Sequence, residues 1–153
     1  MGELLLEEFI ARAKKGTYAS DDGVQKNPRL EGSKELTYRA GIYFYRDIYF
    51  GSRFFNGIET VYINGKPTWG MTYSGGITDP DIDEGKVYDF LKKCLYLVDE
   101  EAPFRGPKSF SDNDFYYTNQ FQGEIDHFMG YETIEIDETT VYELHYSGGT
   151  LYP

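Results

Sequence analysis

Two stretches of the chain place apolar residues at helical spacing. The first is Glu3–Lys15, where Gly16 follows at a helix end and the apolar stripe consists of Leu5, Leu6, Phe9, Ile10 and Ala13. The second follows Asp81-x-x-Glu84, which resembles a capping box, and its stripe consists of Val87, Phe90, Leu91, Cys94, Leu95 and Val98. Each pattern predicts a helix with one face packed on a sheet, and the place of Cys94 in its stripe predicts a buried thiol.

The remaining chain alternates apolar and polar residues, as strands do. Asn64-Gly65 predicts a two-residue hairpin turn, and Asp137-Glu138 is a weaker version of the same turn. We therefore expect three antiparallel strands after each helix, at residues 40–50, 54–64 and 67–74, and then at 113–122, 127–137 and 140–147. Two Tyr-Ser-Gly-Gly segments are interpreted as turns that end strands. Thr17–Glu35 has no periodicity and is predicted to be a long surface loop.

The two halves of the chain resemble each other. A shift of 73 residues aligns Tyr43–Gly76 with Tyr116–Gly149 without a gap and with ten identities over 34 positions. Such a match predicts an internal duplication. The expected fold is therefore α+β: one domain, residues 1–153, made of two pseudo-symmetric α-β-β-β halves (about 1–77 and 78–153) with helices packed on an antiparallel sheet.

Strand alternation also suggests a binding site. Glu59 and Glu132, at matching positions, fall on the apolar faces of their strands, where carboxylates seldom lie without a partner. Arg46 falls in the middle of an apolar face of the preceding strand, and Arg105 would stand at the site mouth. The candidate ligand-binding residues are Arg46, Glu59, Trp69, Tyr73, Glu132 and Tyr146. Alternatives to a site remain. For the glutamates, a bulge before Glu59 shifts the strand register, or both glutamates lie at a sheet rim in water. For the aromatic residues, the alternative is that they simply belong to the hydrophobic core.

Composition narrows the function classes. The chain has 15 Lys and Arg against 26 Asp and Glu, a net charge of −11, which disfavours direct binding to nucleic acid or to an anionic membrane. It has one cysteine, no signal peptide and no apolar run of the roughly 20 residues that cross a bilayer. His127 and His145 lack further ligands at metal-binding spacing. We therefore expect a cytoplasmic protein without a metal or other cofactor.

Several segments together resemble a known family. They are Tyr45-Arg46-Asp47-Ile48-Tyr49-Phe50-Gly51, Gly57-Ile58-Glu59-Thr60-Val61, Asn64-Gly65-Lys66-Pro67-Thr68-Trp69-Gly70-Met71-Thr72-Tyr73 and Phe104-Arg105-Gly106-Pro107. The sequence is similar to a prokaryotic domain of unknown function, found alone or fused behind Xre-type helix-turn-helix regulators. The resemblance implies no activity and no catalytic residues, and this chain has no helix-turn-helix of its own.

Three functional hypotheses follow. The leading one is a small-molecule binding or sensing module with inward-facing Arg and Glu in an aromatic cavity. A carboxylate without a counter-charge has a raised pKa, which suits acid–base catalysis by Glu59 and Glu132 and equally suits recognition of an amine. The third hypothesis is a protein-interaction or homodimerisation module that uses a stripe of Tyr43, Tyr45 and Tyr49.

Overall fold

The computed structural model describes residues 4–17 and 28–152. Of the predicted loop at Thr17–Glu35, residues 18–27 lie outside the described residues. Its last two residues, Lys34 and Glu35, belong to a strand instead. The elements, in chain order, are α1 (Leu6–Gly16), β1 (Lys34–Ala40), β2 (Tyr43–Gly51), β3 (Phe54–Ile63), β4 (Lys66–Ile77), α2 (Glu84–Tyr96), β5 (Ser109–Asp112), β6 (Phe115–Glu124), β7 (His127–Ile136) and β8 (Thr139–Thr150).

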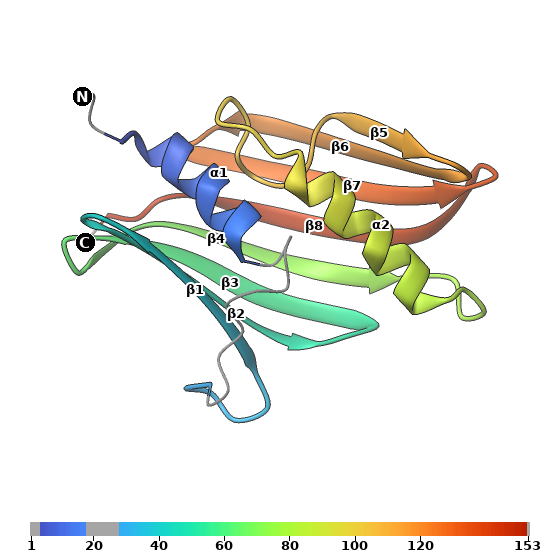
Figure 1. The fold of residues 1–153 in the computed structure, drawn as a ribbon, viewed down its shortest axis with the longest axis horizontal. Coiled ribbons are helices and arrows are strands. Elements are labelled where there is room, and N and C mark those ends of the chain that lie inside the picture. Colours follow the sequence, from blue (N-terminus) through green and yellow to red (C-terminus); the bar gives the residue numbers. More distant parts are fainter. Residues whose placement is uncertain (1–3, 18–27, 153) are drawn as a thin grey trace.

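All eight strands form one antiparallel sheet in the order β1-β2-β3-β4-β8-β7-β6-β5. Both helices lie on the same face of this sheet (Figure 1). The predicted α+β class, with helices packed on an antiparallel sheet, is confirmed. Each half has four strands rather than the three expected, because β1 and the four-residue β5 form the two edges of the sheet.

The helices bury most of the stripes that the sequence predicts, except Leu5, which precedes α1 as its N-cap and is 60% exposed. Phe9, Ile10 and Ala13 of α1 are fully buried, and Cys94 of α2 is buried as a packed thiol. Burial raises the pKa of Cys94 to about 12, so this thiol stays protonated. The start of α2 differs from the predicted capping box. Its N-cap is Asp83, whose carboxylate accepts a hydrogen bond from the backbone N–H of Lys86 at 3.3 Å.

The two halves share several local features. A register shift occurs at Val61/Tyr62 in the first half and at Ile134/Glu135 in the second, 73 residues later. For β2 and β6, however, matching positions are 72 residues apart in the sequence rather than 73, since Gly51 and Gly123 both have a φ of 92° at the end of their strand. Three residues separate Gly51 from Phe55, whereas four separate Gly123 from Phe128. Duplication itself stays a prediction.

The halves meet where β4 pairs with β8, with Tyr73 opposite Tyr146. The Tyr-Ser-Gly-Gly segments lie inside these two strands, so their interpretation as turns is wrong. A Cβ at Gly75 would overlap the backbone of Glu143 and Leu144, and one at Gly148 would overlap the backbone of Gly70. These glycines therefore serve the close approach of the two central strands.

Within residues 4–17 and 28–152, neither helix is long and apolar enough to cross a membrane.

Candidate functional site

Both glutamates of the repeated Gly-x-Glu-Thr lie between the sheet and the helices. Glu59 of β3 and Glu132 of β7 are fully buried, as strand alternation predicts. The register shift in β3 comes after Glu59, at Val61/Tyr62, so the alternative of a bulge before Glu59 is wrong. Two carboxylates have thus been taken out of water, and each needs compensation from its neighbours.

The carboxylate of Glu132 is compensated by three side chains. Arg105 donates Nε to Oε2 at 3.1 Å and Nη2 to Oε1 at 2.7 Å. The hydroxyls of Tyr117 and Tyr142 donate at 2.5 and 2.7 Å. A bidentate guanidinium with two phenols gives this carboxylate four hydrogen bonds, which is a stable structural arrangement.

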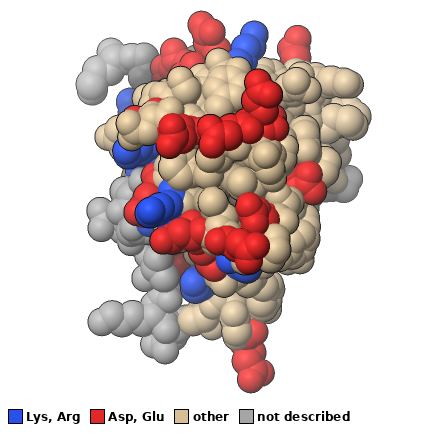
Figure 2. Space-filling view, turned by 90° about the vertical axis from the view of Figure 1, so that its right-hand side faces the viewer, with Lys and Arg blue, Asp and Glu red and all other residues tan. Residues whose placement is uncertain are grey.

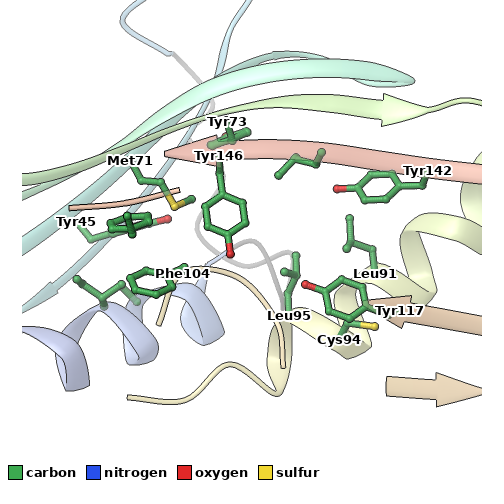
Figure 3. Packing of buried hydrophobic residues seen from close by; sticks show 14 of the residues in the cluster. Tyr45, Met71, Tyr73, Leu91, Cys94, Leu95, Phe104, Tyr117, Tyr142 and Tyr146 are labelled. Carbon is green, nitrogen blue, oxygen red and sulfur yellow. The ribbon is translucent and has the colours of Figure 1, made fainter. Parts of the chain in front are cut away.

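The residues around Glu132 continue this network. The hydroxyl of Tyr117 accepts a hydrogen bond from the N–H of Gly106 at 3.0 Å, and Asn119 donates Nδ2 to the carbonyl of Gly106 at 3.1 Å. The hydroxyl of Tyr146 donates to Oδ1 of Asn119 at 2.7 Å. Figure 3 shows Tyr117, Tyr142 and Tyr146 between the sheet and α2. The loop after α2 is thereby tied to the second half of the sheet.

Glu59 is less well compensated. The hydroxyl of Tyr45 donates to Oε1 at 2.5 Å, and the ammonium of Lys14 lies 3.4 Å from the same oxygen. Among the described residues, Oε2 has no hydrogen-bond partner. Lys14 is fully buried and also donates to the carbonyl of Phe104. Burial lowers the pKa of Lys14 to about 8, against the opposing effect of Glu59.

A further acid, Asp47, lies beside Glu59. The two residues are opposite each other in the β2–β3 ladder, and Asp47 is 2% exposed. The hydroxyl of Tyr73 donates to Oδ1 of Asp47 at 2.6 Å. Burial, and after it the negative charge of Glu59, raises the pKa of Asp47 to about 8. Asp47 is therefore largely protonated at neutral pH.

Asp47 and Asn119 occupy equivalent places in the two halves. Each lies opposite the glutamate of the next strand, and each accepts a hydrogen bond from the matching tyrosine, Tyr73 or Tyr146. In both halves a glycine permits this geometry. A Cβ at Gly57 would overlap Tyr73, and a Cβ at Gly130 would overlap the ring of Tyr146. The difference between the halves is a carboxyl group where the other half has a neutral amide.

A cleft opens beside Asp47, between α2 and strands β2–β4. This α2 cleft has a volume of about 320 Å³. Its buried floor contains Asp47, Tyr73 and Arg105, and the guanidinium of Arg105 lies 5.9 Å from the centre of the Tyr73 ring. Its walls and rim consist of Lys34, Tyr49, Gly51, Ser52, Phe55, Glu84, Tyr88, Leu91, Lys92 and Leu95. Apolar walls around a few convergent polar groups are typical of ligand-binding sites.

Residues 47–151 match a family described as a domain of unknown function, DUF5680. The match covers about two thirds of the chain. This protein belongs to that family. No curated protein and no solved structure matches the chain. The matched residues include Asp47, Glu59, Tyr73, Arg105 and Glu132, so they contain the floor of the α2 cleft and both buried glutamates.

The structure separates Arg46 from the other predicted site residues. Arg46 lies on the opposite face of the sheet, where its Nε is 2.8 Å from Oε1 of Glu35 and its guanidinium lies over the rings of Phe44 and Tyr62. The expectation that Arg46 faces the glutamates is therefore wrong. Alternation alone favours the face of Arg46 as the inner one, because that face also carries Ile42, Phe44, Ile48 and Phe50. The opposite face is buried because its tyrosine hydroxyls find buried acceptors: Tyr45 donates to Glu59, and Tyr43 donates to the carbonyl of Leu4.

The same exchange of faces buries the tyrosine stripe that was expected to be exposed. Tyr45 is fully buried, Tyr43 is 9% exposed, and Tyr49 is half-buried beside the α2 cleft. The expected exposed stripe is wrong, and homodimerisation stays a prediction without this interface. The exposed apolar residues of β2 and its preceding turn are instead Ile42 and Phe50.

The other predicted residues divide between core and site. Trp69 is fully buried, stacks on Phe128 and donates Nε1 to the carbonyl of Ile125 at 2.9 Å, away from the glutamates. Tyr73 lines the α2 cleft, and Tyr146 belongs to the network around Glu132. Arg105 lies on the cleft floor at 3% exposure rather than at a mouth. Across residues 4–17 and 28–152, His, Cys, Asp and Glu form no group of three that could hold a metal ion.

Sequence reasoning placed Asn119 on the inner face of its strand but missed Lys14 and Asp47. Lys14 lies between apolar positions of a helix whose polar face was expected to be solvated. A signal for Asp47 was present, however. Aligning Tyr45 with Tyr117 and Gly51 with Gly123 places Asp47 on Asn119 and both of them opposite a glutamate.

Proposed function

We propose that this protein is a small-molecule binding or sensing module whose ligand occupies the α2 cleft. The observation that carries the proposal is the carboxyl group of Asp47 on the floor of a 320 Å³ cleft, at a position where the other half has the fully engaged Asn119. Buried titratable groups with a strongly shifted pKa that border a cleft are concentrated at functional sites.

The difference between the halves supports a site in the first half. Around Glu132, the Arg105 guanidinium, two phenols and an amide make a satisfied network. Around Glu59, one carboxylate oxygen is unpaired among the described residues and a second acid lies next to it. A fold that needed only stability would gain from repeating the satisfied arrangement, because unpaired buried polar groups are costly. We infer that the first half retains its acid for a ligand.

The resemblance to domains fused with Xre-type regulators supports a sensing role. We propose a prokaryotic, cytoplasmic protein that binds its ligand without contacting nucleic acid itself. Neither Glu59 nor Glu132 lines the α2 cleft. If a reaction occurs on the bound molecule, Asp47 is better placed than either glutamate to exchange a proton with it.

A fragment screen by ligand-observed NMR, repeated on a blocked variant, tests the proposed function. Ser52 is an exposed residue of the cleft rim, so Ser52→Trp places a large ring at the mouth with little effect on the core. We expect fragments that bind the wild-type protein to lose at least tenfold in affinity to this variant. Ser111→Trp, on an exposed position of β5 outside the cleft, is the matched control and should bind as the wild type does. Fragments that bind all three proteins equally would place the site elsewhere.

A further inference from the structure

We infer that the α2 cleft selects a monoamine, that is, a molecule with one ammonium group on an apolar, ring-sized body. This inference rests on the proposed function and names the ligand class for the same site. It depends on the charge balance of the floor, the chemistry of the walls and the charges around the rim.

The floor has one acid more than its buried bases can neutralise. The buried charges facing one another are Lys14 and Arg105 against Asp47, Glu59 and Glu132. Arg105 forms a bidentate pair with Glu132, and Lys14 lies 3.4 Å from Glu59. Asp47 is the acid that remains, and it accepts a hydrogen bond from the neutral phenol of Tyr73. When Asp47 is ionised, the cluster has one negative charge in excess, which a ligand cation beside Asp47 would balance.

The walls suit a cation with an apolar body. Tyr49, Phe55, Tyr73 and Tyr88 line the cleft together with Leu91 and Leu95. Phe55 lies edge-on to both Tyr73 and Tyr88, at 6.0 and 6.1 Å between ring centres, so these three rings form one aromatic side of the cleft. Aromatic faces attract ammonium groups, most strongly where water is excluded.

The rim limits the ligand to one positive charge. Lys34 and Lys92 stand at the rim and would repel a second ammonium, whereas Glu84 is the one acid among the rim residues named above. At longer range the field favours cations. Acidic side chains gather on the end of the molecule shown in Figure 2, and the loop before α2 contributes Asp79, Asp81 and Asp83 close to Glu84. Such a surface raises the local concentration of cations before they enter.

An anionic ligand fits this floor poorly. Arg105 is the nearest floor cation, but Glu132 already engages its guanidinium through Nε and Nη2. A carboxylate ligand would also lie against Asp47 and next to Glu59, and like charges at such separations repel strongly in a buried site.

Binding of an ammonium to this site moves a proton. In the empty cleft Asp47 is mostly protonated at pH 7, because it is buried beside Glu59 and is stabilised only in part by Tyr73, Lys14 and Arg105. When the ammonium enters, Asp47 ionises, its proton passes to solvent buffer, and the ligand keeps its own proton. Near neutral pH, the affinity for an amine should therefore rise with pH, by up to tenfold per pH unit, until Asp47 is ionised in the free protein near pH 8. Tyr88 of α2 also lines the cleft, and burial raises the pKa of its phenol, so it stays neutral through this range. The other charged groups that face the cleft are Lys34 of β1 and Glu84 and Lys92 of α2.

The test compares three probes of similar size by isothermal titration calorimetry: phenethylamine, 2-phenylethanol and 3-phenylpropanoate. We expect phenethylamine to bind at pH 7 at least tenfold more tightly than either of the others. Its titration in two buffers of different ionisation enthalpy should show release of nearly one proton. An Asp47→Asn variant should lose the preference for the amine and the proton release, whereas Asn119→Gln, in the second half, should keep both.

Each outcome is decisive. If the alcohol or the carboxylate binds as tightly as the amine, and Ser52→Trp abolishes that binding, the proposed function stands and the amine inference is wrong. If no probe binds and no fragment is sensitive to Ser52→Trp, the proposed function is wrong and the inference falls with it. Should Asp47→Asn fold poorly, the two-buffer titration of the wild-type protein still decides, since amine binding without proton release contradicts the inference.

Discussion

Asp47 and Asn119 occupy equivalent positions and differ by one atom, an oxygen in place of a nitrogen. Asn119 accepts the hydroxyl of Tyr146 and donates to the carbonyl of Gly106. The carboxyl of Asp47 accepts from Tyr73 in the same way but has no hydrogen to donate when it is ionised. The cost of burying it appears as its raised pKa, and that cost depends on pH.

Asp47→Asn should therefore change the pH dependence of stability. The folded protein holds a proton on Asp47 up to about pH 8, whereas the unfolded chain loses it near pH 4. A native state that binds more protons than the unfolded state loses stability as pH rises, here across pH 4 to 8. We expect urea unfolding at pH 5, 6, 7 and 8 to show this decline in the wild-type protein and a flatter profile in the variant. Parallel profiles would show that Asp47 is ionised throughout.

The two glutamates should differ in what they contribute to stability. Glu132→Gln leaves the guanidinium of Arg105 buried without a counter-charge, and an arginine cannot shed its proton. We expect a loss of about 3–5 kcal/mol in the free energy of unfolding. Glu59→Gln should cost less, about 1–2 kcal/mol, because the hydrogen bond from Tyr45 is retained in weaker form and Lys14 can lose its proton instead. Urea unfolding of both variants at pH 7 makes the comparison, and equal losses would contradict it.

At the scale of elements, local patterns predicted which segments form but not which face of β2 points inward. The helices, the hairpin at Asn64-Gly65 and six of the strands follow from apolar spacing and turn chemistry, which are properties of neighbouring residues. Both faces of β2 carry large apolar or aromatic side chains, so alternation favours the face of Arg46 over the face of Asp47. The turns after Gly51 and Gly123 differ by one residue, and only an alignment that allows for this difference places Asp47 on Asn119.

The edge strands and the α2 cleft could not be predicted from local sequence patterns, for a different reason. β5 has only four residues, too few for alternation to stand out. The cleft is formed by α2 against β2–β4, elements whose contact depends on how the halves pack. Glu59, Glu132, Tyr73 and Tyr146 were predicted to face inward because each shares one face of a long strand with apolar residues. The buried ammonium of Lys14, in contrast, looks in sequence like any solvated helix residue.

The glycine before each glutamate should be essential to its strand. Gly130→Ala places a methyl group where the ring of Tyr146 lies, and that ring is held by Asn119. We expect a loss of about 1–3 kcal/mol, typical of overpacking. The control is Gly85→Ala at the first turn of α2, where the new methyl meets only the side chain of Asp83. That substitution should be neutral or stabilising by up to about 1 kcal/mol, since alanine favours helices. Thermal unfolding of both variants checks the contrast.

At the scale of the whole molecule, the single tryptophan links the halves. Trp69 belongs to β4, yet it stacks on Phe128 and donates to the carbonyl of Ile125, both in the second half. Its fluorescence should therefore report separation of the halves. We expect urea transitions followed by tryptophan fluorescence and by far-UV circular dichroism to coincide, because the central β4–β8 pairing joins one continuous sheet. A fluorescence change at lower urea would show that the halves separate before they unfold.

The position of α2 has a consequence for motion. Phe90 of this helix stacks on Phe110 and Phe115 of the second half, while the hydroxyl of Tyr88 donates to the carbonyl of Ser52 in the first. A molecule bound in the α2 cleft would contact both α2 and the first half of the sheet, and would therefore stabilise the packing of the helix on the sheet. Backbone amides of α2 and β2 should then exchange their hydrogens for deuterium more slowly, and in step, when the cleft is filled. Ligand binding would thus change the local stability of α2, and a domain in contact with this helix would respond to that change.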